Sequence, residues 1–209
     1  MAYFPFYVEL KDVSVLIVGG GKVALHKVKR ILDYEPKIKV VAKKVDERIK
    51  NIKGVEWEER EFEDSDVEGV RFVIAAAGDE ELDEHITSLC NDKGILINVV
   101  DVKDKCDFIF PSVVSRGKLE IGISSSGASP RITTLLAGEI DNILPNNIEE
   151  ILDYLEKLRP YAKQKISNDL LRARFLSYMA ELTYSRRNIP DDEELEKILN
   201  KFLNPIETI

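Results

Sequence analysis

Cysteine, histidine, methionine and tryptophan are all scarce in this chain of 209 residues, with two, two, two and one copies respectively. Two cysteines allow at most one disulfide bridge, so we expect Cys90 and Cys106 to be reduced thiols in a cytoplasmic protein. The two histidines, His26 and His85, stand alone on predicted helices, and the cysteines form no pair with the spacing of metal ligands. The sequence therefore predicts no dedicated metal site.

Long apolar runs and an excess of positive charge are also missing. No apolar run approaches 18 residues, so we expect no membrane-spanning helix. The first five residues provide no basic segment ahead of a long apolar stretch, so we expect no signal peptide. Lysine and arginine number 30 against 38 acidic residues, a formal charge of -8. This charge argues against a general nucleic-acid or anionic-membrane binder and leaves only local basic patches open.

The first half of the chain alternates short apolar runs with segments of helical period. We predict strands at residues 13–18, 38–42, 56–62, 72–77 and 95–100, and helices at residues 23–34, 44–51 and 80–93. Nearly continuous apolar strands that alternate with helices are typical of a parallel sheet covered on both faces. The fold class is therefore α/β, with a Rossmann-type parallel sheet over residues 1–112.

The pattern changes near Pro111. Two strand-like runs, 112–116 and 118–124, flank Arg116-Gly117 and predict a β-hairpin, and Ser129 with Pro130 predicts the start of a helix. This hairpin and helix, residues 113–145, are too small to bury their own apolar faces, so we expect them to form the contact of a homodimer. From residue 146 to 209 the period is helical only, which predicts a C-terminal helical domain.

Three consecutive glycines, Gly19, Gly20 and Gly21, lie between the first strand and the first helix. Gly19, Gly21 and Ala24 fit the pattern G-x-G-x-x-A. The first glycine permits a tight turn, the second lets a pyrophosphate approach the backbone, and the alanine lets the helix pack closely on the strand. The free N–H groups of the helix N-terminus attract phosphates. The pattern therefore predicts a dinucleotide site, against the alternative of a plain strand–turn–helix.

An acidic residue that would bind the adenosine ribose is missing at the end of the second strand. That position carries Ala42, Lys43 and Lys44, and Asp46 follows slightly late. Backbone groups around Ala42 and Lys44 could bind the ribose instead, whereas the lysines could accept a 2′-phosphate. The residues alone leave the choice between NAD and NADP open.

With these residues in view, the chain resembles the precorrin-2 dehydrogenase module of the siroheme synthase family. The resemblance rests on YFPFYVELKDVSVLIVGGGKVA at the start, ILINVVD at residues 95–101, FIFPSVVSRGKLEIGISSSGASP at residues 108–130, and ILP at residues 143–145. It implies NAD-dependent oxidation of precorrin-2 to sirohydrochlorin, a tetrapyrrole, in siroheme biosynthesis, by a homodimer. We expect a stand-alone form, because no methyltransferase module follows in this sequence.

The resemblance also assigns roles to residues. It implies that Asp101, which ends NVVD, is the catalytic group, and that Lys22, Val23, Lys43 and Lys44 contact NAD. From the residues themselves we expect further cofactor contacts at Gly19, Gly20, Gly21, Ala42 and Asn98, and substrate contacts at Ser124, Ser125, Ser126 and Arg131, whose hydroxyls and guanidinium suit a polyanion. In some bifunctional relatives the serine matching Ser125 carries a phosphate.

The chemistry of Asp101 agrees with this role. Ligands of an open parallel sheet lie outside the carboxyl ends of its strands, which is where Asp101 follows a predicted strand. A carboxylate there can accept or relay the proton that leaves precorrin-2, although Asp101 could equally cap its own loop. Because precorrin-2 is a polyanion, an acidic protein needs a local positive field to bind it. The candidate cations are Lys103, Lys105, Arg116 and Arg131.

Two other functions stay open. One is a bifunctional enzyme that also inserts iron or cobalt into sirohydrochlorin. The other is a non-enzymatic Rossmann module that senses NAD(H) and binds a partner protein. The sequence also leaves open whether the product leads to siroheme, cobalamin or another modified tetrapyrrole.

Overall fold

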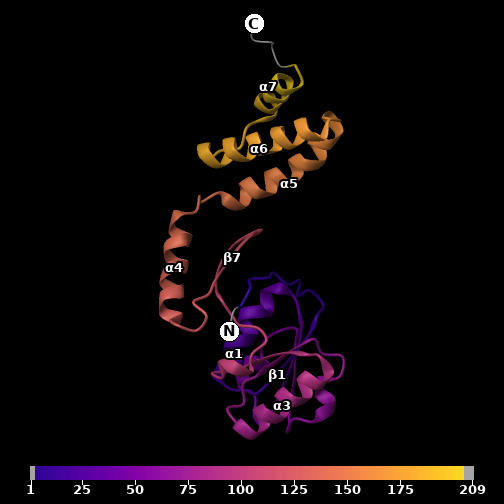
Figure 1. Ribbon diagram of the computed structural model, residues 1–209, viewed down its shortest axis with the longest axis vertical. Helices are drawn as coiled ribbons and strands as arrows, with labels where there is room; N and C mark the ends of the chain where they lie inside the picture. Colours follow the sequence, from indigo (N-terminus) through magenta and orange to yellow (C-terminus); the bar gives the residue numbers. More distant parts are fainter. Residues whose placement is uncertain (1–2, 205–209) are drawn as a thin grey trace. The chain divides into compact units, whose positions relative to one another are not determined.

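The chain separates into two compact units. The computed structural model describes residues 3–204, and the units are Met1–Phe110 and Pro111–Ile209 (Figure 1). Each unit is described by itself below. The boundaries at residues 112 and 145 that the sequence suggests for three parts stay predictions.

A five-stranded parallel sheet forms the centre of the first unit. Its order is β3-β2-β1-β4-β5. The strands are β1 Ser14–Val18, β2 Lys37–Ala42, β3 Val55–Glu59, β4 Phe72–Ala75 and β5 Leu96–Val99, and the helices are α1 Lys22–Ile31, α2 Glu47–Lys50 and α3 Glu80–Lys93. Short 3₁₀ helices lie at Leu32–Tyr34 (η1), Asp64–Val67 (η2) and Lys103–Lys105 (η3). The prediction of a Rossmann-type parallel sheet is confirmed.

Helices cover both faces of this sheet. Successive side chains of a strand point to opposite faces, so each face presents apolar side chains to a helix. On β1, Val15 and Ile17 pack with the residues of α1, whereas Leu16 and Val18 pack with those of α3. Figure 1 shows α1 and α3 with β1 between them. All four of these β1 residues are buried, which explains the continuous apolar run in the sequence.

The order of the strands places a switch point beside β1. The chain passes from β1 outward to β2 and β3, then returns to β4 on the other side of β1. Ligands of open α/β sheets bind outside the carboxyl ends of the strands at such a point. A ligand-binding site is therefore expected at the loop after β1 and the loops after β4 and β5.

The second unit combines a hairpin with four helices. Strands β6 Ser112–Arg116 and β7 Leu119–Ile123 pair antiparallel, and the helices are α4 Pro130–Ile143, α5 Ile148–Lys165, α6 Asp169–Arg186 and α7 Asp192–Leu203. The hairpin and the cap of α4 by Ser129 agree with the sequence-based expectation. Helices α5 and α6 lie side by side and antiparallel (Figure 1), and the Asn147 Nδ2 donates to the carbonyl of Arg187 at 3.0 Å to close the pair.

Aromatic contacts to Phe202 and buried residues of α6 hold the helical part together. Phe175 and Met179 are fully buried, and the Phe175 ring meets Phe202 of α7 at a centroid distance of 5.4 Å. These residues bring α5, α6 and α7 around one apolar cluster. Within residues 3–204, no helix is long and apolar enough to cross a membrane.

Candidate functional site

The glycines after β1 have three different surroundings. Gly19 has a φ of +121°, and a Cβ there would lie 2.4 Å from the carbonyl oxygen of Ala76. A Cβ on Gly20 would lie 2.2 Å from the carbonyl oxygen of Lys44. At Gly21 a Cβ would meet nothing within 4 Å. The first two glycines are therefore required by the protein's own backbone, whereas the position of Gly21 is open.

The N-terminus of α1 opens directly from Gly21. Gly21 is the N-cap residue, makes no side-chain cap, and the first turn contains no acidic residue. The first N–H groups of α1 and the dipole of this helix therefore favour an anion, and Lys22 lies in the same turn. Ala24 is fully buried, which lets the helix approach the sheet closely. This cradle fits the pyrophosphate of a dinucleotide.

The end of β2 differs from the usual ribose site because its acidic residues are engaged elsewhere. Asp46 caps α2 and forms an ion pair with Arg48 at 2.6 Å, and this Arg48 guanidinium holds the pKa of Asp46 well below its usual range. Lys43 pairs with Glu61 at 2.9 Å. Glu61 is thus a partner for one of the two lysines that could accept a 2′-phosphate, although both side chains of this pair are largely exposed.

A cavity of about 780 Å³ lies at the carboxyl ends of β4 and β5. Its walls are formed by Val23 of α1, the loop after β4, Val100 to Val102 after β5, the start of α3 and Lys105. Asp101 is exposed on this wall, in a turn closed by the bond from the Val102 N–H to the Val99 carbonyl at 3.3 Å. The sequence correctly places Asp101 at this edge of the sheet.

The backbone of Asp101 adopts an uncommon conformation. Its φ is +63°, in the left-handed region where non-glycine residues are rare. This conformation costs a non-glycine residue roughly 1 kcal/mol. Asp12, Glu35, Ser126 and Arg187 share it, and Glu35 and Arg187 are helix C-caps. Asp101 lines the cavity and caps no helix of residues 3–204, and its catalytic role stays a prediction.

Carboxylates dominate the charged lining of the cavity. Glu80, Asp83, Glu84 and Asp101 face one cation, Lys105, and the Lys105 Nζ already lies 3.1 Å from the Glu84 Oε1. Sequence reasoning missed Asp83. The available signal was its place on the apolar face of α3, three residues before Ile86 and seven before Cys90, both fully buried.

Asn98 does not lie at this cavity. Its side chain is buried and faces α1, where the Nδ2 donates to the Phe108 carbonyl at 2.9 Å and the Oδ1 accepts from Lys27 Nζ at 3.4 Å. These contacts tie β5 to the segment that follows η3. The structure thus gives Asn98 a packing role, and its assignment as a cofactor contact stays a prediction.

The serine loop belongs to the second unit and is shaped by its own hydroxyls. The Ser124 Oγ accepts from the Ser126 N–H at 3.0 Å, and the Ser125 Oγ accepts from the Ser129 N–H at 2.9 Å. Ser126 has a φ of +52°. These bonds lead the chain into α4, whose first turn contains no acidic residue and includes the exposed Arg131. The loop is thus a defined turn before a helix N-terminus that Ser129 caps, with its Oγ accepting from the Ile132 N–H at 3.3 Å.

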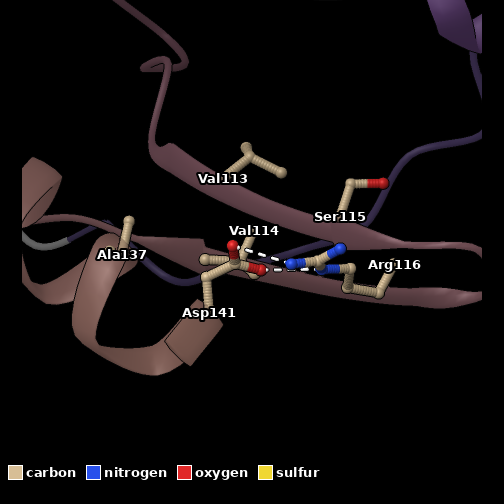
Figure 2. A pocket seen from close by; sticks show the side chains of 7 residues that line it. Val113, Val114, Ser115, Arg116, Ala137 and Asp141 are labelled. Atoms are coloured by element: carbon tan, nitrogen blue, oxygen red, sulfur yellow. Dashed lines mark hydrogen bonds and ion pairs between the residues drawn. The ribbon is translucent and has the colours of Figure 1, made fainter. Parts of the chain in front are cut away.

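A second cavity, of about 430 Å³, lies between the hairpin and α4 (Figure 2). The Arg116 guanidinium and the Asp141 carboxylate point toward each other across it, with two contacts of 2.8 and 2.9 Å. Arg116 was a candidate for binding substrate carboxylates, but its charge is already paired. The rest of the lining is Val113, Val114, Ser115, Ala137 and Gly138, so Arg116 is the one cation of this cavity and it is already paired.

The cysteines and potential metal ligands provide no further site. Within residues 3–204 no group of three or more histidine, cysteine, aspartate or glutamate side chains could hold a metal ion. Cys90 and Cys106 are free thiols. Burial raises the pKa of Cys90 to about 11, so this thiol is a poor nucleophile.

The parallel sheet, the glycine loop and the cavity beside it define a Rossmann-type dinucleotide-binding protein. Residues 6–112 match the family model for NAD(P)-binding domains, and the chain belongs to this NAD(P)-binding family. The nicotinamide dinucleotide expected as cofactor agrees with this family.

Similar proteins agree with the resemblance seen in the sequence. The chain is 34% identical over 178 residues to the siroheme synthase of Buchnera aphidicola subsp. Acyrthosiphon pisum (strain APS), which covers 84% of this chain and 38% of that protein. It is 34% identical over 212 residues to the siroheme synthase of Thioalkalivibrio sulfidiphilus (strain HL-EbGR7). This alignment covers 98% of this chain and 43% of that protein. The chain thus spans about two fifths of the length of these relatives.

A solved structure shares the fold along nearly the whole chain. The protein titled SirC, precorrin-2 dehydrogenase, superposes with a TM-score of 0.76 at 22% identity, over 96% of this chain and 99% of that one. The similarity therefore extends over both units of the chain.

Proposed function

We propose that this chain oxidises precorrin-2 to sirohydrochlorin with NAD⁺. The observation that carries the proposal is the position of Asp101 on the wall of the cavity that also contains Val23, two residues after the open glycine Gly21. One connected region thus offers an anion cradle, space for a ring and a carboxylate. The similarity to siroheme synthases and the fold shared with a precorrin-2 dehydrogenase support the choice of substrate.

Bound NAD⁺ supplies the hydride acceptor of this reaction. The chain's own residues then have three tasks. The backbone at Gly21 and the first turn of α1 hold the pyrophosphate, and the cavity at the ends of β4 and β5 keeps the reacting rings in contact and excludes water. The Asp101 carboxylate accepts the proton that leaves the substrate carbon, directly or through one water.

The carboxylates of precorrin-2 must be bound away from the acidic cavity. Within this proposal, the turn Ser124 to Ser126 and Arg131 at the start of α4 bind them. The positive end of the helix dipole, hydroxyls and a guanidinium are suitable partners for carboxylates. The exposed apolar residues of α4 support a homodimer, and the two free thiols support a reducing compartment such as the cytoplasm.

The test is the growth of NADH absorbance when NAD⁺ and freshly prepared precorrin-2 are supplied to the protein. We expect one NADH for each sirohydrochlorin formed, and slower turnover with NADP⁺ because Glu61 offsets Lys43. Binding of NAD⁺ without turnover would favour a sensing module instead. Incubation of sirohydrochlorin with ferrous or cobaltous ion, without NAD⁺, tests the chelatase alternative separately.

A further inference from the structure

A series of polar contacts runs through the first unit, from α1 to the turn that carries Asp101. It begins at Lys27 of α1, whose Nζ donates to the Asn98 Oδ1 of β5 at 3.4 Å. The Asn98 Nδ2 in turn lies 3.4 Å from the Cys106 Sγ. The mechanism proposed above uses neither Lys27 nor Cys106, so the purpose of these contacts is open to inference.

The Cys106 thiol contacts both ends of the turn formed by residues 99–102. Its Sγ lies 3.2 Å from the Val99 carbonyl oxygen and 3.3 Å from the Val102 carbonyl oxygen. Burial raises the pKa of Cys106, so the thiol keeps its proton at neutral pH and can donate to either carbonyl. Asp101 lies inside this turn with a φ of +63°. The thiol therefore holds the two ends of a turn whose conformation is costly for Asp101.

The other end of the series is a partly buried cation. The Lys27 Nζ lies 3.9 Å from the centre of the Phe110 ring, which follows β5 in the chain. Burial lowers the pKa of Lys27, and the negative charge of Asp101 is among the influences that oppose this shift. Because α1 begins at the proposed pyrophosphate cradle, the contacts of Lys27 connect the cofactor helix with the segment that carries the proposed proton acceptor.

The physical effect of such a network is on position more than on stability. Hydrogen bonds that involve a thiol are weak, so each adds little to the free energy of unfolding. A connected set of polar groups nevertheless selects one arrangement of the elements that it joins. A reacting group that is displaced by about 1 Å can cost about 10²-fold in rate. We therefore expect the network to matter for turnover.

We propose that three side chains, Lys27, Asn98 and Cys106, are positioning residues for the reaction. They hold the turn of residues 99–102 so that the Asp101 carboxylate keeps a fixed place relative to a dinucleotide bound at the start of α1. None of the three lines the cavity at the ends of β4 and β5, so they act through the turn. This inference rests on the proposed function and on the role of Asp101 in it.

The experiment measures kcat for the oxidation of precorrin-2, as NADH absorbance, and NAD⁺ affinity by calorimetric titration. Cys106→Ala removes the donor to the turn, and we expect kcat to fall by about tenfold while NAD⁺ affinity is nearly unchanged. Cys106→Ser restores a donor at this position and should recover most of the loss. Lys27→Met keeps the apolar stem beside Phe110 but removes the donor to Asn98, and should lower kcat by about threefold.

Two control variants show what a purely local or a purely structural change does. Lys29 is an exposed lysine on the same helix, so Lys29→Met should change neither kcat nor NAD⁺ affinity. Cys90 is a fully buried thiol of α3. Cys90→Ala should lower the melting temperature and keep the wild-type kcat, so that lower stability alone does not reproduce the predicted effect.

A double-mutant cycle tests whether the network acts through Asp101. Once Asp101→Asn has removed the carboxylate, its misplacement no longer matters. Cys106→Ala should therefore lower the residual kcat of Asp101→Asn by less than about twofold, instead of about tenfold. A defect elsewhere in the site would lower the rate by the same factor in both backgrounds.

The outcomes separate this proposal from the proposed function. A wild type that does not oxidise precorrin-2 would remove both, and an Asp101→Asn variant with the wild-type kcat would remove the role of Asp101 and the network with it. If the wild type is active and Asp101→Asn is slow, any of four results removes this proposal alone. They are a wild-type kcat in Cys106→Ala and Lys27→Met, no recovery in Cys106→Ser, an equal fall of kcat and NAD⁺ affinity, or losses that multiply in the cycle.

Discussion

Neighbouring glycines of the loop after β1 have separable roles. A side chain at Gly21 enters open space, so Gly21→Val should keep the fold but occupy the position of the pyrophosphate. We expect the affinity for NAD⁺ to fall by at least about tenfold, or 1.4 kcal/mol, with little change in melting temperature.

The matched control is the preceding residue. Gly20→Ala places its Cβ 2.2 Å from the Lys44 carbonyl oxygen, so it should lower the melting temperature even without ligand. If Gly21→Val binds NAD⁺ like the wild type in a calorimetric titration, the dinucleotide site is not at this loop.

Sequence reasoning identified one carboxylate of the cavity and missed another. Asp101 could be found because a residue that follows a buried strand must lie at the carboxyl edge of the sheet. Asp83 was hidden inside a charged helix, where burial depends on how α3 packs on the sheet. The alternation of side chains along β5 turns Asn98 toward α1, and its role as a cofactor contact stays a prediction.

At the scale of elements, a buried ion pair fixes the outer edge of the sheet. The Asp66 carboxylate of η2 is 2% exposed and accepts from the Arg60 Nη1 at 2.7 Å. The Arg60 guanidinium holds the pKa of Asp66 well below its usual range, although burial opposes this shift. The pair therefore ties the segment after β3 to η2.

Loss of this carboxylate should have a pH-dependent cost. Because the pKa of Asp66 in the folded protein lies below the unfolded value of 3.8, its carboxylate stabilises the protein at pH values above 3.8. This contribution disappears as the pH falls through the folded-state pKa. Asp66→Asn should lower the free energy of unfolding by about 2 kcal/mol at pH 7. This loss is smaller than the loss expected for a fully buried ion pair, because Arg60 is partly exposed. Urea unfolding of the wild type and Asp66→Asn, at pH 7 and at decreasing pH below 3.8, measures the difference in their free energies of unfolding. A difference that stays constant with pH would contradict the prediction.

Helix and strand bounds followed the sequence wherever local signals were complete. The helix predicted at residues 80–93 is α3 to the residue, because Asp79 caps it and Gly94 ends it in the left-handed conformation. The helix predicted at residues 44–51 shortens to Glu47–Lys50, since the Val45 N–H donates to the Glu59 carboxylate of β3 at 2.9 Å. That bond joins residues of different elements, which periodicity does not reveal.

At the scale of the whole molecule, the hairpin and α4 leave an apolar surface without cover in the single chain. Ile132, Leu135 and Ile143 of α4 are 52%, 45% and 72% exposed. A second copy of the chain is the proposed cover. Light scattering at micromolar concentration should give twice the chain mass of 23.8 kDa, and Leu135→Glu should shift the mass toward the monomer. A wild-type mass near 23.8 kDa would contradict the dimer.

The most direct test of the account compares wild type and Asp101→Asn in the oxidation of precorrin-2, followed as NADH absorbance. Asparagine keeps the size of the side chain but removes the basic carboxylate. We predict a kcat lower by about 10²–10⁴-fold, the usual contribution of a general base, with NAD⁺ affinity and melting temperature nearly unchanged. A variant that folds, binds NAD⁺ and oxidises precorrin-2 within about threefold of the wild-type rate would contradict the catalytic role of Asp101.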